Sequence, residues 1–270
     1  MVVQKTTKSE FVYYMLCDKE RGEQMKQRAT EWIEKVNTEY HERQFKEPYR
    51  STVAFCDWLE EIGYIQKDSQ LRIIDLCSGQ GANIYYLGKR YPKSTFTGVD
   101  INSDLVISGN KFFKDSKIWN CHLEIGDIYK LDRKYVSEFD GILSFQTLSW
   151  LPEFKEPIEA MVDLQARWIA LTSLFYDGQV SCTIEVREYD TTLNPRRDSF
   201  YNVYSLPVIE KCLSEKGYRN LQFTPFEIDI DLPKPSKKVM STYTEKLENE
   251  HRLQISGPLL MPWYFIAARK

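Results

Sequence analysis

Histidine is scarce in this chain, and its cysteines are not regularly spaced. Its 270 residues include 3 histidines and 6 cysteines, and no two of these cysteines stand in the C-x-x-C spacing of a metal or redox motif. The H-x-x-H spacing found in many metal sites is also missing. The sequence therefore predicts no metal centre, and the cysteines are expected to be reduced and to pack as small apolar residues.

Long apolar runs and an excess of one charge are absent as well. No stretch reaches the ~18 consecutive apolar residues of a membrane-spanning helix, and residues 1–9 lack the apolar segment of a secretory signal. The formal net charge is −3, from 36 basic and 39 acidic residues, which is unlike a dedicated nucleic-acid binder. We expect a soluble, cytoplasmic protein that binds neither membrane nor nucleic acid, either as a monomer or as a homodimer.

The chain does contain a short apolar run closed by two glycines, between Leu71 and Ile84. The run predicts a buried parallel strand, and Ser78-Gly79-Gln80-Gly81 predicts a tight turn in which glycine lets a ligand approach the backbone. From Asn83 onward the sequence predicts a helix whose first N–H groups point back at this turn. The pattern is typical of a site for a nucleotide-like cofactor.

Details of the turn indicate the charge of that cofactor. The dinucleotide fingerprint G-x-G-x-x-G/A requires a third small residue, where this chain has Ile84. Asp75, four residues before Gly79, would repel a pyrophosphate, whereas it would attract a cationic ligand. A positively charged cofactor is therefore favoured over a nicotinamide dinucleotide.

More strands follow at regular intervals. Residues 94–100 predict a strand that ends in Asp100, 19 residues after Gly81, the spacing of an acid that binds a ribose diol. Further strands are predicted at 121–125, 139–145 and 168–175, and helices at 82–91, 103–114 and 155–167. This alternation predicts an α/β fold built on a parallel sheet.

In order and spacing these motifs resemble those of the class I (Rossmann-like) S-adenosylmethionine-dependent methyltransferases. The D-x-x-x-G-x-G pattern from Asp75 to Gly81 is similar to their first motif, and the stretch from Gln146 to Trp150 is similar to their fourth. The resemblance implies a seven-stranded sheet with helices on both faces and its last strand antiparallel beside the fifth. It also implies S-adenosyl-L-methionine as the cofactor and S-adenosyl-L-homocysteine as the product.

The same resemblance assigns contacts to the cofactor. Asp127 would bind the adenine amino group with Ile128 against the ring, and Tyr49 and Arg50 would meet the methionine carboxylate. The expected cofactor-binding residues are Asp75, Ser78, Gly79, Gln80, Gly81, Asn83, Asp100, Ile101, Asp127, Ile128, Gln146, Tyr49 and Arg50.

Two parts are predicted along the chain, an N-terminal helical lid over residues 1–64 and a methyltransferase domain over 65–270. The lid would hold a helix over 20–40 and a second over 52–62, with Ser51 as its N-cap. The last third would carry β-rich insertions near 178–202 and 233–254. Its elements are predicted as a strand at 180–190, an irregular polar loop at 191–202, a helix at 206–216, a strand or strand pair at 221–232, a charged insertion at 233–254 and a strand at 259–270.

The absence of two motifs narrows the class of molecule that can accept the methyl group. No D/N-P-P-Y/F motif follows the fourth predicted strand, and no Pro-Cys dipeptide is present, so amino groups of DNA or protein and cytosine C5 are disfavoured. What remains is an oxygen or nitrogen of a small molecule, methylated by in-line displacement without a metal. Fainter similarity of residues 204–207, 226–233 and 256–265 to sugar-tailoring methyltransferases points to a sugar or surface-polysaccharide precursor.

Acceptor contacts are expected after the carboxyl ends of the strands. The residues predicted to line the acceptor pocket are Trp150, Tyr176 and Arg187, with Arg196 and Arg197 as further cations for an anionic acceptor. Weak candidates for a general base are His41, Glu185 and Tyr189, although each fits a structural role better.

Two other functions fit the same motifs. A catalytically silent cofactor-binding protein would keep the glycine turn and have a blocked acceptor pocket. A nicotinamide-dependent oxidoreductase would share the sheet and Asp100, but Ile84 and Asp75 argue against it. The ligand that the purified protein binds, and the state of the acceptor pocket, would separate these alternatives.

Overall fold

A computed structural model describes residues 43–236 and 239–270. The helix predicted over residues 20–40, the candidate base His41 and Cys17 lie outside the described residues. Residues 43–64 of the segment predicted as a lid are within the described range.

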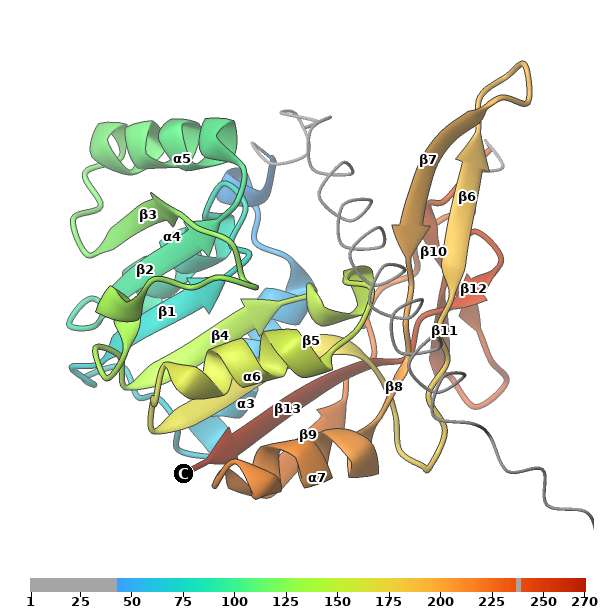
Figure 1. Ribbon diagram of the computed structural model, residues 1–270. Coiled ribbons are helices and arrows are strands. Elements are labelled where there is room, and N and C mark those ends of the chain that lie inside the picture. The colour runs from blue at the N-terminus through green and yellow to red at the C-terminus, as the bar shows by residue number, and fades with distance from the viewer. Residues whose placement is uncertain (1–42, 237–238) are drawn as a thin grey trace, which may run out of the picture.

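The core of the fold is a sheet in the order β3-β2-β1-β4-β5-β13-β9 (Figure 1). Its strands are β1 Arg72–Leu76, β2 Thr95–Asp100, β3 Cys121–Ile125, β4 Gly141–Phe145, β5 Trp168–Tyr176, β9 Arg219–Pro225 and β13 Trp263–Arg269. Strands β1 to β5 run parallel, and β13 is antiparallel to both β5 and β9. A short strand, β8 Tyr204–Ser205, adds to the end of β5. The predicted seven-stranded α/β sheet, with its last strand antiparallel beside the fifth, is confirmed.

Helices cover both faces of this sheet, as predicted. One face carries α3 Arg50–Glu61, α4 Ala82–Arg90 and α5 Ser103–Asp115, and the other carries α6 Lys155–Asp163 and α7 Leu206–Glu215. The sequence explains the division, because successive side chains of a strand point to opposite faces. Ile73 of β1 packs with the first group of helices and Ile74 with the second. Two 3₁₀ turns, η2 Arg133–Tyr135 and η3 Leu148–Trp150, follow β3 and β4.

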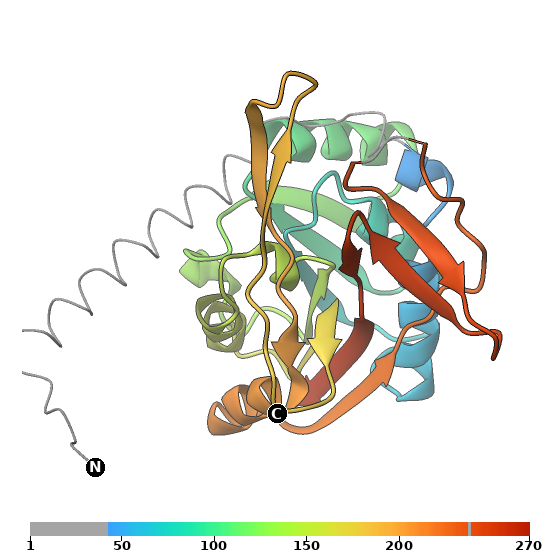
Figure 2. The same ribbon diagram turned by 90° about the vertical axis from the view of Figure 1, so that its right-hand side faces the viewer.

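Two smaller β units complete the described part of the chain. One is a hairpin of β6 Glu185–Tyr189 and β7 Pro195–Phe200, and the other is a sheet of β10 Thr242–Lys246, β11 Arg252–Ser256 and β12 Leu259–Leu260. Both stand beyond the carboxyl ends of the parallel strands (Figure 1), and Figure 2 looks onto this edge with both units in front. We call it the carboxyl edge.

The prediction of an irregular polar loop over 191–202 is wrong, because residues 195–200 form β7. The turn between β6 and β7 is held by the Asp190 carboxylate, which accepts hydrogen bonds from the backbone N–H groups of Thr192 and Asn194. Residues 233–254, predicted only as a charged insertion, likewise contain β10 and part of β11. Both units are largely solvated, so their polar sequences give little periodic signal.

Several predicted element ends also need correction. Ser51 is not an N-cap: α3 begins at Arg50 with Tyr49 as its N-cap residue. Helix α6 ends at Asp163 rather than at 167, because Gln165 has a positive φ of 61° that turns the chain into β5. Strand β9 ends at Pro225 rather than continuing to 232. The segment after β9 is held by ion pairs instead of strand pairing. Every second residue from 227 to 231 is an acid with a basic partner: Glu227 binds His251, Asp229 binds Arg50 and Asp231 binds Arg252.

Gly109 gives a test of how closely α5 packs on the glycine turn. A Cβ at this position would lie 2.3 Å from the backbone oxygen of Gln80 and 2.4 Å from Cδ1 of Leu123. Alanine usually favours a helix over glycine by about 1 kcal/mol. Here Gly109→Ala is instead expected to lower the free energy of unfolding by about 1–3 kcal/mol, because the backbone of the turn must shift.

Denaturant unfolding of this variant measures the effect. Lys111→Ala, on the exposed part of the same helix, is the matched control and is expected to stay within about 0.5 kcal/mol of the unaltered protein. An unchanged or raised stability for Gly109→Ala would contradict the close contact.

Candidate functional site

The glycine turn joins β1 to α4 in an unusual backbone conformation. Cys77, Gly79 and Gly81 have positive φ angles of 61°, 56° and 83°. Gly81 is the N-cap residue of α4, and a Cβ there would lie 2.7 Å from the ring of Phe113. The turn therefore requires glycine at this position for both conformation and space. It leaves the first N–H groups of α4 at the carboxyl edge, where they can face an anionic group.

Asp100 ends β2 and holds this turn in place. One carboxylate oxygen, Oδ2, accepts a hydrogen bond from the N–H of Gly79 at 2.7 Å, and the other, Oδ1, accepts one from the N–H of Asn102 at 2.9 Å. Burial raises the pKa of Asp100, while the backbone N–H donors oppose that rise. Each oxygen keeps a further lone pair for a ligand hydroxyl.

Asp75 is the most unusual side chain of the site. It lies in β1, is 1% exposed, and neither carboxylate oxygen has a hydrogen-bond partner among the described residues. Burial, and to a lesser degree the charge of Asp100, raises the pKa of Asp75 well above its ordinary value. A buried carboxylate without a partner is costly. Such a group fits a site in which a bound cation supplies the missing partner.

Other predicted cofactor residues surround the same strand ends. Ile101 follows β2 and is 38% exposed, while Ile128 is buried. Asp127 accepts a hydrogen bond from the N–H of Tyr129, which fixes the turn after β3. Ser78 is largely buried, and its Oγ has no hydrogen-bond partner in the described chain. Gln80 points instead toward α5, where its Nε2 donates to the hydroxyl of Ser108.

The start of α3 reaches the site as well. Tyr49 accepts a hydrogen bond from Nε2 of Gln44, and Arg50 binds Asp229 with contacts of 2.8 and 2.7 Å to its two carboxylate oxygens. Gln146, at the end of β4, has a positive φ of 54° and donates to the hydroxyl of Ser51. In this structure the Arg50 guanidinium is therefore paired with an acid of the segment between β9 and β10.

An aromatic cluster lies at the carboxyl edge. The ring of Trp150 in η3 lies 4.3 Å from that of Tyr201 and 6.4 Å from that of Trp263, centroid to centroid. These residues share a small apolar core with Leu174 at the end of β5 and Met261. Tyr201 and Trp263 were not among the predicted site residues. They come from distant parts of the chain, and no local pattern marks them.

The other described residues predicted to line the acceptor pocket or to act as a base lie away from this cluster. They are on the β6–β7 hairpin or at the end of β5. Ile184 and Val186 pack into the aromatic cluster, and strand alternation puts Glu185, Arg187 and Tyr189 on the opposite, exposed face. Arg187 is bound there by Asp198 through two contacts of 2.8 and 2.9 Å. Tyr176 is 51% exposed at the end of β5, Arg196 is exposed, and Arg197 pairs with Glu188. Of the predicted acceptor residues, Trp150 thus belongs to the aromatic cluster, and the arginines of the hairpin do not.

A surface hollow of about 590 Å³ lies along α4 rather than at the glycine turn. Phe45, Tyr85, Tyr86 and Lys89 are among the residues that line it. None of the predicted cofactor residues does. The hollow is therefore separate from the candidate site at the carboxyl edge.

Residues 43–236 and 239–270 contain no metal centre, disulfide or membrane-spanning helix. There, no group of three or more His, Cys, Asp or Glu side chains is arranged to hold a metal ion. The cysteines at 56, 77, 121, 182 and 212 are free thiols. Within the same residues, no helix has the length and apolar character needed to cross a bilayer.

Sheet order, glycine turn and strand-end acids together define a Rossmann-like methyltransferase fold. Two solved structures share it. The YcgJ protein from Bacillus subtilis has a TM-score of 0.55 at 11% identity over 82% of this chain and 99% of that chain. A SAM dependent methyltransferase from Aquifex aeolicus has a TM-score of 0.51 at 13% identity over 87% of this chain and 98% of that chain.

The family model matches a smaller part of this chain than the two solved structures do. Residues 67–188 match the family described as "Methyltransferase domain". Protein RP028 of Rickettsia prowazekii (strain Madrid E), described as uncharacterized, is 35% identical over 80 residues, or 30% of this chain. This chain covers only 32% of the length of that relative. Residues 67–188 thus match a methyltransferase domain family, in agreement with the resemblance that the motifs indicate.

Proposed function

We propose that the protein transfers a methyl group from S-adenosylmethionine to an oxygen or nitrogen of a small-molecule acceptor. The observation that carries this proposal is the buried, unpartnered carboxylate of Asp75 beside the glycine turn. A dinucleotide would bring a pyrophosphate to this position, where the carboxylate would repel it. S-adenosylmethionine would instead bring an ammonium and a sulfonium.

The remaining cofactor contacts follow from the strand ends. The turn from Ser78 to Gly81 and Asn83 would face the methionine end, where the N-terminus of α4 favours its carboxylate. Asp100 would accept hydrogen bonds from the ribose hydroxyls. Asp127 would bind the adenine amino group, with Ile101 and Ile128 on the two faces of the ring.

We place the acceptor at the aromatic cluster, next to η3. Support comes from its position after β4 and β5, the edge at which open α/β sheets bind their ligands. Rings of Trp150 and Tyr201 provide apolar faces with polar edges, which suits a sugar or another amphipathic small molecule. Arg187 and Arg197 would bind an anionic acceptor only if their hairpin ion pairs opened, whereas Arg196 is exposed.

Alignment is the main task of this chain in the reaction. When bound, S-adenosylmethionine supplies a methyl group on a positively charged sulfur. The protein has to hold the acceptor atom in line with that methyl group and exclude water. The apolar cluster around Trp150 and Trp263 would contribute the dry wall of such a site. Residues 43–64, the described part of the segment predicted as a lid, pack on the sheet through α3, and no catalytic base is assigned.

Calorimetric titration with S-adenosylhomocysteine, in parallel with NADH, tests the proposal. We expect micromolar binding of the first and no binding of the second. A screen of small-molecule acceptors with radiolabelled methyl donor would then identify the substrate. Binding of NADH alone would favour an oxidoreductase, and binding of neither would remove the cofactor site.

A further inference from the structure

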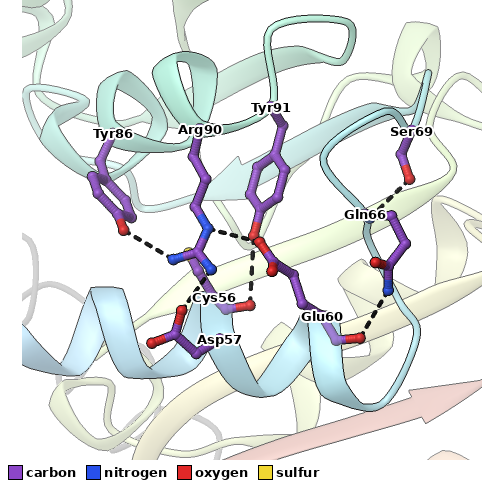
Figure 3. Close-up of polar contacts among 8 residues, drawn as sticks. All are labelled: Cys56, Asp57, Glu60, Gln66, Ser69, Tyr86, Arg90 and Tyr91. Carbon is purple, nitrogen blue, oxygen red and sulfur yellow. Dashed lines mark hydrogen bonds and ion pairs between the residues drawn. The ribbon is translucent and has the colours of Figure 1, made fainter.

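Helix α3 is fixed to the cofactor domain along its length. Arg90 of α4 donates from Nε to Glu60 at 2.8 Å and from Nη2 to Asp57 at 2.5 Å, and its Nη1 donates to the hydroxyl of Tyr86 (Figure 3). Just after the helix, Arg269 of β13 donates to the backbone oxygens of residues 62 and 63. These contacts leave α3 little freedom to turn relative to α4 and the sheet.

Its first turn reaches three different elements with three consecutive side chains. Arg50 binds Asp229 in the segment before β10. The hydroxyl of Ser51 accepts from Nε2 of Gln146 at 3.1 Å. Thr52, which is 2% exposed, donates from Oγ1 to Oδ1 of Asn83 at 2.8 Å. Residues i, i+1 and i+2 of a helix point in directions about 100° apart, so one turn can contact all three elements.

Two of these contacts hold a side-chain amide in place. Because Thr52 donates to Oδ1 of Asn83, the Asn83 NH₂ group is left to donate elsewhere. Because Ser51 accepts from Nε2 of Gln146, the Gln146 carbonyl oxygen is left to accept. The first turn of α3 thus leaves a donor on α4 and an acceptor after β4 turned away from it.

This pair of amides matches one particular chemical group. A free α-amino acid end carries a carboxylate, which needs donors, and an ammonium, which needs acceptors. Asn83 lies in the first turn of α4, where the helix N-terminus also favours a carboxylate. Gln146 follows β4, the neighbour of β1, and the unpartnered Asp75 lies in β1. Acceptors for the ammonium are therefore offered by adjacent strands.

We propose that Ser51 and Thr52 are positioning residues that orient Gln146 and Asn83 for the amino-acid end of S-adenosylmethionine. The inference rests on the proposed function, since it takes S-adenosylmethionine as the ligand of the cleft. Neither hydroxyl needs to touch the ligand. Their role is to distinguish the complete cofactor from adenosine thioethers that lack the amino-acid group.

Two ligands that differ only in this group test the inference. S-adenosylhomocysteine carries the amino-acid end, and 5′-methylthioadenosine keeps the adenosine and the sulfur without it. In Thr52→Val and in Ser51→Ala, calorimetry is expected to show affinity for S-adenosylhomocysteine reduced about threefold to tenfold, the loss of one hydrogen bond. Affinity for 5′-methylthioadenosine should change by less than about twofold.

Two further variants separate positioning from folding. Thr52→Ser keeps the hydroxyl and should restore the affinity for S-adenosylhomocysteine. Thr95→Val makes the same substitution at the exposed start of β2, and should bind both ligands normally. An equal loss for both ligands in Thr52→Val, or no loss at all, would overturn the inference while leaving the proposed function in place. Failure of the unaltered chain to bind S-adenosylhomocysteine would overturn both.

Discussion

Asp75→Asn is expected to weaken binding of S-adenosylhomocysteine about 100-fold, which corresponds to ~2.7 kcal/mol. The substitution keeps the size of the side chain and removes only its charge. In the complex proposed here, the buried carboxylate and the ligand ammonium are each other's main charged partner. Loss of one partner leaves the other ion buried without compensation, which is why the effect should exceed that of an exposed ion pair.

Without ligand, the same substitution should act in the opposite direction. Burial raises the pKa of Asp75 in the folded chain, whereas in the unfolded chain the carboxyl titrates near its ordinary value of about 3.9. A raised folded pKa means that the stabilising contribution is present at low pH and is lost as the pH rises above about 3.9 toward the folded pKa. The unliganded Asp75→Asn protein should therefore gain stability relative to the unaltered one as the pH increases.

Ligand affinity should depend on pH for the same reason. Pairing with an ammonium requires the ionised carboxylate, so binding releases a proton from chains in which Asp75 is protonated. The affinity of the unaltered protein should rise with pH through the raised pKa of Asp75, and this part of the dependence should vanish in Asp75→Asn. Calorimetry at several pH values measures the affinity, and denaturant unfolding without ligand measures the stability.

Asp163→Asn is a suitable control, because Asp163 is exposed at the end of α6. It should change neither quantity appreciably. Unchanged affinity in a folded Asp75→Asn protein would show that no cation binds at this carboxylate, and the proposed cofactor orientation would then be wrong.

Asp100→Ala is expected to weaken binding of S-adenosylhomocysteine by ~1–3 kcal/mol, or about 5- to 150-fold. Two losses contribute to this effect. The ribose hydroxyls lose a charged acceptor, and the N–H groups of Gly79 and Asn102 lose the oxygens that now hold the glycine turn. The free energy of unfolding should fall as well, because these hydrogen bonds would no longer hold the turn in its positive-φ conformation.

Asp100→Asn tests the second loss, which is that of the oxygens that hold the glycine turn. Its amide has one acceptor oxygen and one donor NH₂ group, so either Gly79 or Asn102 must face a donor instead of an acceptor. We expect its stability to be closer to that of Asp100→Ala than to that of the unaltered chain. Asp115→Ala, exposed at the end of α5, controls for removal of an acid. Normal affinity in a folded Asp100→Ala protein would remove Asp100 from the site.

The sheet and the glycine turn could be predicted because their signals are local. Asp75, Gly79, Gly81 and Asp100 lie within 26 consecutive residues. The two acids lie in strands with a clear apolar pattern, and the two glycines form the turn before a helix. The place of the last strand was predicted from the family resemblance. These elements are buried, so their side chains are constrained by packing on both faces of the sheet.

Contacts between distant segments could not be predicted in the same way. The ring of Trp263 reaches Trp150 only because β13 is inserted beside β5, and nothing near either residue indicates that contact. Arg50 was expected at the methionine carboxylate, yet an acid 179 positions away competes for it. Strand β6 falls within the strand predicted at 180–190, whereas β7 was missed because its sequence, Pro195-Arg-Arg-Asp-Ser-Phe200, has no alternation of apolar residues.

The position of β13 also sets an order of events during synthesis. This strand lies between β5 and β9 although it follows both in sequence, so β9 cannot join the sheet until β13 has left the ribosome. Strands β1 to β5, which carry the glycine turn and the strand-end acids, can pair with one another earlier. Until β13 arrives, β5 has an open edge with nine residues of mostly buried, apolar character. A nascent chain paused in this interval would expose a strand edge prone to intermolecular pairing.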